Sequence, residues 1–536
     1  METMQILTAE EMSACDRLTS EQFGVSMSRL MLAAGRAVAL FARRCFPGRK
    51  RILVLCGRGH NGGDGMVAAR ELALAGNNVS LVLLGEEAGL RAEVRDCWNG
   101  LASTPGVVVS VCRTPEELGE LLASKRDVDL IVDAIVGTGL QAALRGLPAM
   151  AVDWLGRANA PVLAVDLPSG WNADATSAEE AAPADAVVTF TAPKLAHALG
   201  SGLTRRWSDP VIVAPIGSPR EAVRSQTQLH WTGTAKSLFE APRAANAHKG
   251  SFGHVLVAGG SAGKTGAVAM AAMAAMRTGA GLVTAAAPAA LLHSVAGFAP
   301  EMMSLPLESD AAALLERKTV LAIGPGMGTS DAARQIFWEL LEACTVPVVI
   351  DADGLNLLAQ QMSRISSKMA GKQWILTPHP GEMARLAGIG VAELEANRLA
   401  TARSFARQYQ VTLILKGHRT LVAHPDGSVA VNTTGNPGMA KGGSGDVLTG
   451  MVAAALAQFP ARPKDAVEAA VHLHGLAGDF AAAQWGEHSM LATDMLQCLP
   501  AAIRLRDADG WTWLQGAAQD AIRHKQDASL RKENRQ

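Results

Sequence analysis

Short apolar runs alternate with helix-like stretches along most of this 536-residue chain. Such alternation is typical of α/β layers built around a largely parallel sheet. A chain of this length is also too long for one ordinary core. The runs form two separate series, each long enough to fold alone. The sequence therefore predicts two α/β domains.

The first series begins after an expected helix, for which Thr8 and Glu11 form a capping-box pattern. Its expected strands are residues 51–55, 79–84, 130–136, 162–166, 186–190 and 211–216.

The second series ends in an expected hairpin at residues 420–432, with Asp426-Gly427 at its turn. The polar stretch 217–228 breaks the strand pattern between the two series. We therefore expect one domain over residues 1–225, a second over 226–510, and a polar tail over 511–536. The expected strands of the second domain are residues 254–259, 282–287, 320–324, 347–351, 374–377 and 411–416.

Charge and composition exclude several classes of function. The formal net charge is -1, so no global field attracts nucleic acid or anionic membranes. The seven cysteines are scattered without metal-binding spacing, as expected of reduced thiols. The N-terminal residues lack the pattern of a signal peptide, and apolar runs such as 267–276 are too short to cross a bilayer. We expect a cytoplasmic protein without nucleic-acid or membrane partners; a homo-oligomer is compatible with the sequence.

The first expected strand is followed by a glycine-rich loop. Gly57, Gly59 and Gly62 satisfy G-x-G-x-x-G between a strand and a helix, which makes a Rossmann dehydrogenase an open alternative. However, the acidic residue expected about 20 positions later is best supplied by Glu86 or Glu87, which lie further away. Asp64 at the mouth of the helix would also repel a pyrophosphate. Both departures weaken the dehydrogenase interpretation.

Four ordered motifs are more specific than that loop alone. "GRGHNGGDG" (57–65), "VDAIVGTGL" (132–140), "AVDLPSGWNAD" (164–174) and "TFTAPK" (189–194) resemble motifs of the NAD(P)H-hydrate epimerase family, with His60 where the family often has Asn. The resemblance covers essentially the whole first series and implies a Rossmann-like, three-layer α/β/α domain.

The resemblance also implies roles for individual residues. Asp166 would act as acid and base at the hydrated nicotinamide ring, and K⁺ would bind near Asn61, Asp133 and Ser169. Standing alone, an Asp at a strand end is usually a cap, so only the combination of motifs supports these roles. The implied contacts to the substrate, besides Asp166, are Asn61, Gly62, Gly63, Asp64, Gly65, Gly137, Thr138, Gly139 and Leu140.

The second series opens with a loop that resembles a nucleotide-binding P-loop. Gly263-Lys264-Thr265 follows an expected strand, although Ala258 stands in place of the first glycine of that motif. Residues 347–353 could serve as the magnesium-holding strand of such a site. A P-loop NTPase is therefore a second alternative, but it leaves the glycine-rich stretch 436–450 unexplained.

That stretch, "NPGMAKGGSGDVLTG", places a carboxylate at the start of a glycine-rich helix. Backbone N–H groups of Gly443, Ser444 and Gly445 would stabilise charge on a transferring phosphoryl group. Asp446 would accept the proton of the attacking hydroxyl, because a base must lie within hydrogen-bond reach of that proton. Anion site and base together predict phosphoryl transfer.

Helices of this kind carry a G-x-G-D motif in ribokinase-like kinases, which the stretch resembles. In order, "HKGSFGHVLVAGGSAGKTGA", "IGPGMG", "DADGLNLL", "LTPHPGEMARL", "LKGHRT" and "GNPGMAKGGSGDVLTG" closely resemble the NAD(P)H-hydrate dehydratase family over about residues 248–450. The resemblance implies a ribokinase-like α/β domain that phosphorylates the C6 hydroxyl of (S)-NAD(P)H hydrate and then loses phosphate.

The implied donor is ADP, which would leave as AMP, or ATP; fused two-domain proteins of this resemblance usually use ADP. Mg²⁺ would bridge the donor phosphates, with no ligand residue assigned. Asp446 would contact the substrate hydroxyl. The other implied contacts are Ala267, Gly326, Gly328 and His379 for the hydrated dinucleotide, and Lys416, Gly417, His418, Arg419, Thr420 and Gly445 for the donor nucleotide.

Simpler interpretations remain for three of these side chains. His379 could cap a helix or turn, and Lys416 could be a solvated strand end. Lys441 stands where the family more often has a small hydroxyl residue, and it could bind phosphate or point into solvent. For the whole chain, a small-molecule kinase or a non-catalytic nucleotide sensor are the competing classes. The sequence favours a bifunctional enzyme that repairs hydrated NADH and NADPH.

Overall fold

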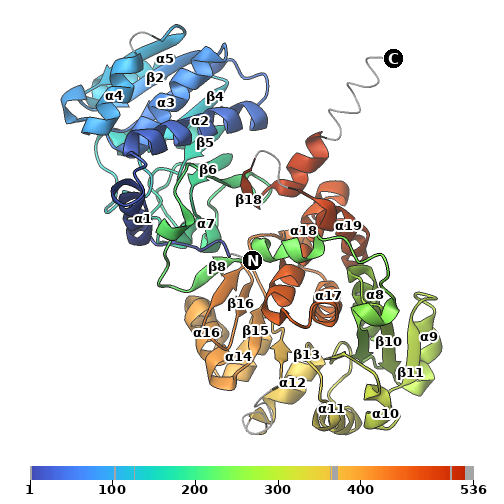
Figure 1. Ribbon diagram of the computed structural model, residues 1–536. Helices are drawn as coiled ribbons and strands as arrows, with labels where there is room; N and C mark the ends of the chain where they lie inside the picture. The colour runs from blue at the N-terminus through green and yellow to red at the C-terminus, as the bar shows by residue number, and fades with distance from the viewer. Residues whose placement is uncertain are drawn as a thin grey trace, which may run out of the picture. The chain divides into compact units, whose positions relative to one another are not determined.

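The computed structural model describes residues 3–101, 104–125, 127–362, 364, 372–506 and 510–524. Contacts divide the chain into two compact units (Figure 1). The N-terminal unit comprises residues 5–227 and 506–517, and the C-terminal unit comprises residues 228–505 together with described residues near both termini. The first division falls between residues 227 and 228, at the end of the polar stretch predicted to separate the domains.

The N-terminal unit is built on one sheet, in which the described strands have the order β18-β7-β6-β5-β4-β1-β2-β3. All neighbouring strands are parallel except β18, which runs antiparallel to β7. The strands are β1 (Arg51–Cys56), β2 (Asn78–Leu84), β3 (Val107–Cys112), β4 (Leu130–Ala134), β5 (Val162–Val165), β6 (Ala186–Phe190), β7 (Val211–Ala214) and β18 (Thr512–Gln515).

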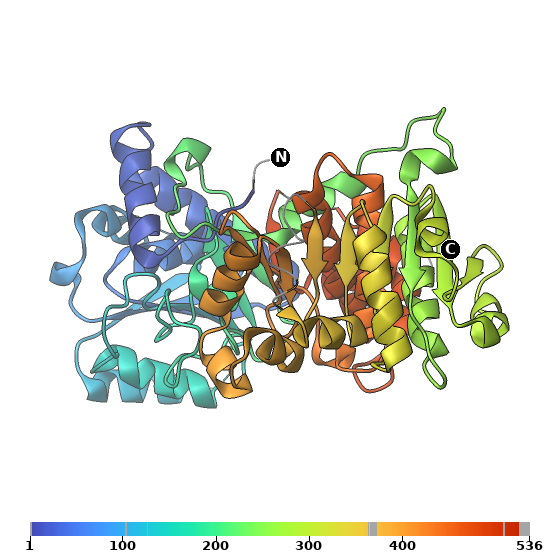
Figure 2. The ribbon, with the colours of Figure 1, turned by 90° about the horizontal axis from the view of Figure 1, so that it is seen from below.

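Helices cover both faces of this sheet, giving three layers (Figure 2). Because side chains alternate along a strand, Val54 and Cys56 of β1 pack into one apolar cluster, and Leu53 and Leu55 pack into another. The helices are α1 (Ala9–Glu21), α2 (Met27–Cys45), α3 (His60–Leu74), α4 (Ala92–Leu101), α5 (Pro115–Ser124), α6 (Leu147–Arg157) and α7 (Leu195–Leu199). This is the predicted Rossmann-like arrangement.

The strand order reverses between β1 and β4. From β1 the chain continues to β2 and β3 on one side, and then returns to β4 on the other. The loops that follow β1 and β4 therefore run in opposite directions from the carboxyl end of the sheet and leave a crevice between them, where open α/β folds bind their ligands. Both predicted phosphate-binding loops of this unit lie at this point.

The C-terminal unit has a longer sheet of order β11-β10-β9-β12-β13-β14-β15-β16-β17-β8. It is parallel from β11 to β15, whereas β16 runs antiparallel to both of its neighbours, so the predicted hairpin is confirmed. The strands are β8 (Leu229–Trp231), β9 (His254–Ala258), β10 (Leu282–Ala287), β11 (Met303–Pro306), β12 (Val320–Ile323), β13 (Val348–Ile350), β14 (Trp374–Leu376), β15 (Thr412–Leu415), β16 (Leu421–Ala423) and β17 (Val429–Val431).

Helices again cover both faces, with α11 in front of the strands and α17 and α18 behind them in Figure 2. The helices of this unit are α8 (Thr265–Thr278), α9 (Leu292–Ala296), α10 (Ala311–Leu315), α11 (Asp331–Ala343), α12 (Asp353–Ala359), α14 (Pro380–Ala387), α15 (Val391–Ala396), α16 (Arg398–Tyr409), α17 (Ser444–Gln458), α18 (Pro463–Trp485) and α19 (Ala492–Arg504). No described helix is long and apolar enough to cross a membrane.

Two sequence expectations need comment. The capping box at the first helix is confirmed, because the Thr8 hydroxyl accepts from the Glu11 amide and the Glu11 carboxylate accepts from the Thr8 amide. The polar tail predicted for residues 511–536 is wrong at its start, because Thr512–Gln515 forms β18. This strand is retained by apolar packing, since the rings of Trp511 and Trp513 contact Phe41 of α2. Residues 525–536 of that prediction lie outside the described residues.

Candidate active sites

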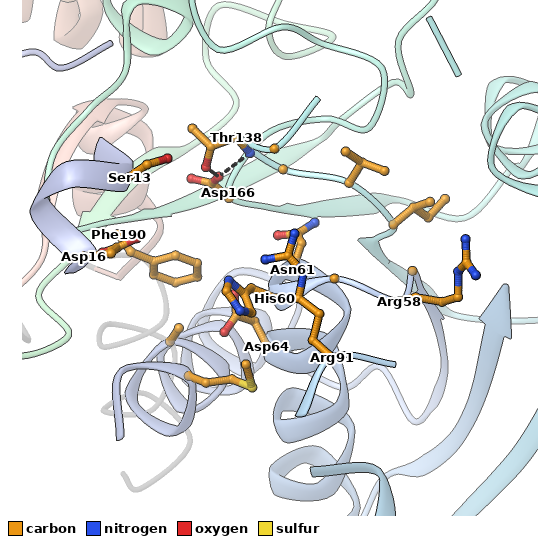
Figure 3. Close-up of a pocket in the computed structure, with 18 of the residues that line it drawn as sticks. Ser13, Asp16, Arg58, His60, Asn61, Asp64, Arg91, Thr138, Asp166 and Phe190 are labelled. Carbon is orange, nitrogen blue, oxygen red and sulfur yellow. Dashed lines mark hydrogen bonds between the residues drawn. The ribbon is translucent and has the colours of Figure 1, made fainter. Parts of the chain in front are cut away.

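A cavity of about 830 Å³ lies at the reversal point of the N-terminal unit (Figure 3). Its wall includes loops that follow β1, β4 and β5, together with one side of α1. Of the residues predicted to contact substrate here, the cavity is lined by Asn61, Asp64, Gly137, Thr138, Gly139 and Asp166.

The glycines of the first loop serve mainly to let α3 approach the sheet. A Cβ at Gly62 would collide with the carbonyl oxygen of Gly57, and one at Gly63 would lie 2.5 Å from Sδ of Met31. Gly65 is closed off in the same way by Ala134. These glycines allow the first turn of α3, with Asn61 and Asp64, to approach the end of β1 closely.

Asp166 is the most constrained carboxylate of this cavity. It has a left-handed backbone with φ of 66°, and its residue is 5 % exposed. Its Oδ2 accepts from the amide and hydroxyl of Thr138 at 2.9 and 2.5 Å, and its Oδ1 accepts from Thr189 Oγ1 and Lys194 Nζ at 2.8 and 2.9 Å. Burial opposes ionisation, but the charges of Lys194 and His197 and these hydrogen bonds hold the pKa of Asp166 well below its usual range. Asp166 is therefore an ionised carboxylate.

Lys194 was quoted in a motif but given no role by the sequence. It is 1 % exposed, and its ammonium also donates to Thr189 Oγ1 at 2.7 Å. An isolated parallel β-bridge between the backbones of Leu7 and Lys194 attaches the segment before α1 to this part of the chain. The motif "TFTAPK" could have revealed Lys194, but the contribution of α1 had no signal in the sequence.

Besides Glu86, which lines the cavity near the end of β2, two further carboxyl groups line it, and both resist ionisation. Burial, then the charges of Asp166 and Asp16, raise the pKa of Asp64 well above its usual value. Burial, with a contribution from Asp166, raises the pKa of Asp16 of α1 to about 6. The cavity thus combines one ionised carboxylate with two groups that hold protons more readily. No sequence motif pointed to Asp16.

The residues predicted to hold K⁺ supply oxygen atoms near Asp166. The side-chain oxygen and nitrogen of Asn61 are both buried, and neither has a hydrogen-bond partner among the described residues. A Cβ at Gly137 would lie 2.7 Å from Asp166 Oδ2 and 3.0 Å from Asn61 Oδ1, so these oxygens flank the same glycine. Asp133 and Ser169 bond to each other, with Oγ of Ser169 2.5 Å from the carboxylate. An unsatisfied amide oxygen beside the Asp166 carboxylate fits an alkali cation.

The second candidate site lies where the loops after β13 and β15 meet the start of α17. Gly443, with φ of 98°, precedes the helix, and Gly445 leaves room for a close approach. A Cβ at Gly445 would lie 3.3 Å from Lys416 Nζ and 3.6 Å from Asp351 Oδ2. Of the three predicted amide donors, that of Ser444 already makes a long bond to the Lys441 carbonyl, at 3.4 Å.

Asp446 has no hydrogen-bond or ion-pair partner among the described residues. Burial, followed by the charge of Asp351, raises the pKa of Asp446 to about 7. Lys416 instead pairs with Asp351, with Nζ 2.8 Å from Oδ1, while Thr449 donates to Oδ2 of the same carboxylate at 2.7 Å. Asp351 is 1 % exposed, and although burial opposes its ionisation, Lys416 lowers its pKa. A free, readily protonated carboxylate thus lies beside a fixed cation.

Helix α18 holds the glycine-rich loop in place through two buried side chains. His474 Nε2 lies 2.9 Å from the Ser444 carbonyl, and Asp479 accepts from the Gly435 amide at 3.1 Å and the Asn436 side chain at 3.0 Å. Each of these side chains on α18 is less than a tenth exposed. The loop that precedes Asp446 is therefore fixed at both ends by one buried helix, which the sequence did not indicate.

Of the residues predicted to contact the hydrated dinucleotide, Ala267, Gly326 and Gly328 lie at the reversal point between β9 and β12, whereas His379 precedes α14 and Asp446 lies in the first turn of α17. Gly326 and Gly328 have φ of 63° and 79°, and a Cβ at Gly326 would lie 3.0 Å from that of Ala267. Lys264 pairs with Asp353 at 3.1 Å. The same Asp353 carboxylate accepts from the Gly328 amide at 2.8 Å. The lysine of the apparent P-loop is thus paired with the first residue of α12, whose carboxylate also holds the loop after β12.

Three side chains make contacts within the protein that bear on their sequence interpretations. His379 caps α14, and its Nδ1 accepts from the Gly381 amide at 3.0 Å, so the simpler alternative is confirmed. Arg419 is buried and donates to the Thr433 carbonyl at 3.1 Å. Lys441 donates to the carbonyls of His488 and Met490 at 2.7 and 2.6 Å, which neither alternative anticipated.

The comparisons with known proteins cover both units. A family model described as NAD(P)H-hydrate dehydratase matches residues 255–501, and one described as YjeF-related protein N-terminus matches residues 27–196. The bifunctional NAD(P)H-hydrate repair enzyme Nnr of Moorella thermoacetica is 40 % identical, covering 94 % of this chain and 97 % of that protein. The chain belongs to the family of bifunctional NAD(P)H-hydrate repair enzymes.

Other members of this family give the same result. The enzyme of the same name from Escherichia coli is 35 % identical, covering 92 % of each chain. The chain is also similar to a crystal structure from Bacillus subtilis, an ADP/ATP-dependent NAD(P)H-hydrate dehydratase co-crystallised with ATP and Mg²⁺, with 33 % identity, a TM-score of 0.45, and coverage of 50 % of this chain and 95 % of that one.

Membership decides between the open alternatives. A Rossmann dehydrogenase or a P-loop NTPase would not match these two family models in this order over nearly the whole chain. The family also agrees with the predicted fold, a Rossmann-like unit followed by a ribokinase-like unit. Clusters of three or more His, Cys, Asp or Glu side chains able to hold a metal are absent from the described part of the chain.

Proposed function

We propose that the N-terminal cavity interconverts the two epimers of hydrated NADH and NADPH at C6, and that the C-terminal site dehydrates the S epimer at the expense of ADP. Damage gives both epimers, so a dehydratase that accepts one needs an epimerase for the other. The free carboxylate of Asp446 at the start of α17 carries the second half of this proposal.

In the epimerase, Asp166 accepts the proton of the C6 hydroxyl. It is ionised and held on both oxygens, so it presents a fixed base to the ring. Loss of that proton lets the C6–N1 bond open to an aldehyde, and reclosure on the other face gives the second epimer. Lys194 keeps Asp166 ionised between turnovers, and Asp64 or Asp16 supplies a proton to the ring nitrogen and later recovers it.

Asn61, Asp133 and Ser169 would hold K⁺ in this unit. When bound, the cation would offset negative charge from Asp166 and from the substrate phosphates. The unsatisfied amide of Asn61 supports this assignment. A rise in the melting temperature with KCl, but not with tetramethylammonium chloride at equal ionic strength, would test it without an activity assay.

In the dehydratase, Asp446 accepts the proton of the C6 hydroxyl as that oxygen attacks the terminal phosphoryl group of ADP. AMP leaves, and the amides at the start of α17 together with Lys416 stabilise charge on the transferred group. Phosphorylation makes the oxygen a good leaving group, so the C6–O bond breaks and inorganic phosphate departs. The adjacent ring carbon C5 gives up a proton, which the departing phosphate can accept, and the C5–C6 double bond of the reduced nicotinamide is restored. Mg²⁺ would bridge the phosphates of the donor.

The test supplies the protein with both hydrate epimers, Mg²⁺, K⁺ and either ADP or ATP, and follows the return of reduced-nicotinamide absorbance. Complete recovery with release of AMP and phosphate supports the proposal and names the donor. Recovery of one epimer only would refute the epimerase. Accumulation of a phosphorylated dinucleotide would instead identify a ribokinase-like kinase.

A further inference from the structure

We propose that Arg58 and Arg91 form a subsite for the 2′-phosphate of hydrated NADPH at the mouth of the N-terminal cavity. This inference rests on the proposed epimerase function. It concerns the end of the cavity next to β2, to which neither the motifs nor the reaction chemistry assigned a role.

The cavity has two chemically different ends. Asp16, Phe190 and Lys194 surround Asp166 at one end. Arg58, Glu86 and Arg91 line it where β1 and β2 end. Figure 3 shows Ser13 and Asp16 on one side of Asn61 and Arg58 on the other. A dinucleotide whose ring lies at Asp166, with its pyrophosphate at the loop after β1, therefore extends its adenosine towards the arginines.

Arg58 is held in place by the turn that follows β2. A Cβ at Gly85 would lie 3.1 Å from Cδ of Arg58, and one at Gly89 would lie 2.6 Å from its Nη1. The two glycines thus leave room for the arginine stem to lie along the turn. Arg58 is exposed, yet this packing directs it to the carboxyl end of β2, where doubly wound folds bind the adenosine ribose.

Neither arginine is neutralised by another described residue. The guanidinium groups of Arg58 and Arg91 make no hydrogen bond or ion pair in the described part of the chain, whereas that of the nearby Arg95 donates to the carbonyls of Ala88 and Leu90. The charge of Arg91 reaches into the cavity, because after burial it is the next contribution that lowers the pKa of His60. Two available cations therefore line the cavity away from Asp166, with Arg91 beside His60 and Arg58 further out (Figure 3).

The third phosphate of the substrate is the group that best matches this pair. The pyrophosphate is common to both substrates and is expected at the first turn of α3. Only hydrated NADPH carries a further phosphate on the adenosine ribose, and guanidinium groups bind phosphate through paired, charge-assisted hydrogen bonds. Glu86 is the carboxylate that lines this end of the cavity in the described part of the chain. It would accept hydrogen bonds from the free adenosine-ribose hydroxyls of hydrated NADH.

The experiment measures epimerisation of hydrated NADPH and hydrated NADH separately, without ADP or Mg²⁺, in wild type, Arg58→Ala and Arg91→Ala. We expect KM for hydrated NADPH to rise about 10-fold or more in each variant, with kcat within about threefold. KM for hydrated NADH should change by less than about threefold. Arg157→Ala removes the same charge from α6, outside the cavity lining, and serves as the matched control.

A second readout uses inhibitors of the same epimerase assay. Adenosine 2′,5′-bisphosphate should inhibit the wild type more strongly than adenosine 5′-monophosphate, and Arg58→Ala should remove that difference. Equal losses for both hydrates would place the arginines on the pyrophosphate and overturn the subsite, as would unchanged KM values. Absence of epimerisation in the wild type would instead refute the proposed function.

Discussion

Asp166 and Asp446 are both aspartates near the carboxyl end of a parallel sheet, but their surroundings give them opposite protonation behaviour. Lys194 pairs directly with Asp166 and lowers its pKa. Lys416 lies near Asp446 but pairs with Asp351, so that burial and the second carboxylate raise the pKa of Asp446 to about 7. The comparison teaches that the partner of the lysine, more than its presence, sets the ionisation of the carboxylate.

The difference suits the two reactions. A base that takes and returns the proton of one hydroxyl must stay ionised between turnovers, and Asp166 does so through its permanent partner Lys194. A base that acts once per phosphoryl transfer benefits from a pKa near the working pH, because it must first accept the proton and then release it. Substitutions at the two aspartates and at the groups around them should therefore affect the two activities separately.

Asp446→Asn should remove dehydration and leave epimerisation unchanged. The amide cannot accept the hydroxyl proton, so kcat for dehydration should fall by about 10⁴-fold. Binding of the donor nucleotide should persist, as measured by equilibrium titration with ADP. A variant that still dehydrates at more than a tenth of the wild-type rate would exclude Asp446 as the base.

Asp166→Asn should give the reciprocal result. Epimerisation should fall by about 10³-fold, because the fixed base is lost, while the S epimer is still dehydrated at the normal rate. Recovery of a mixed sample should therefore stop once the S epimer is consumed, apart from slow spontaneous exchange. Complete recovery at the wild-type rate would assign the proton transfer to another group.

The pH profiles of the two activities should differ, and Asp351 should control one of them. Because a base acts only when ionised, kcat/KM for dehydration should fall as the pH decreases below about 7, the pKa of Asp446. Epimerisation should show no such decrease from Asp166, whose pKa is lowered.

In Asp351→Asn, Asp446 loses a neighbouring negative charge, so its pKa should fall. The acidic limb of the pH profile for dehydration should then move to lower pH, by on the order of one unit. The maximal rate should also fall about 10-fold, since Lys416 loses its partner. Lys464→Ala removes a lysine that pairs with Asp426 at the hairpin turn and leaves Lys416 and Asp351 paired, so it should not shift the limb. An unshifted limb in Asp351→Asn would show that Asp351 does not control the ionisation of Asp446.

Lys441→Ala should have the smallest effect. Its ammonium ties the glycine-rich loop to the carbonyls of His488 and Met490, so its loss should lower the melting temperature of the C-terminal unit by about 1–3 °C. Because this side chain is engaged away from Asp446, kcat for dehydration should change by less than threefold. A large increase in KM for ADP would instead show that Lys441 binds the phosphates of the donor.

The motifs predicted which loops form each site, because glycines and strand ends are local features. They did not predict which side chains would pair across those loops. The bond from Lys194 to Asp166 spans 28 positions and that from Lys416 to Asp351 spans 65, so each depends on the strand order of its sheet. His474 and Asp479 escaped notice for the same reason, since nothing near them in the sequence points to the loop they hold.

The strands that were missed had weaker local patterns. β3 is only partly buried at the edge of its sheet, and β8 and β11 are short edge strands. β18 follows a long polar stretch, and only the packing of Trp511 and Trp513 against α2 reveals its place. Core strands such as β1 were predicted to within one residue, because a parallel strand that is buried on both faces is apolar throughout.

The return of β18 to the first sheet also sets an order of assembly. A ribosome releases residues 5–227 long before residues 506–517 exist, so the growing chain carries a nearly finished first sheet whose outer edge at β7 stays open while the entire second unit is made. Exposed strand edges favour pairing with other chains. Expression of residues 5–227 alone should therefore yield a protein prone to aggregate, and adding residues 506–517 as a separate peptide should restore its solubility.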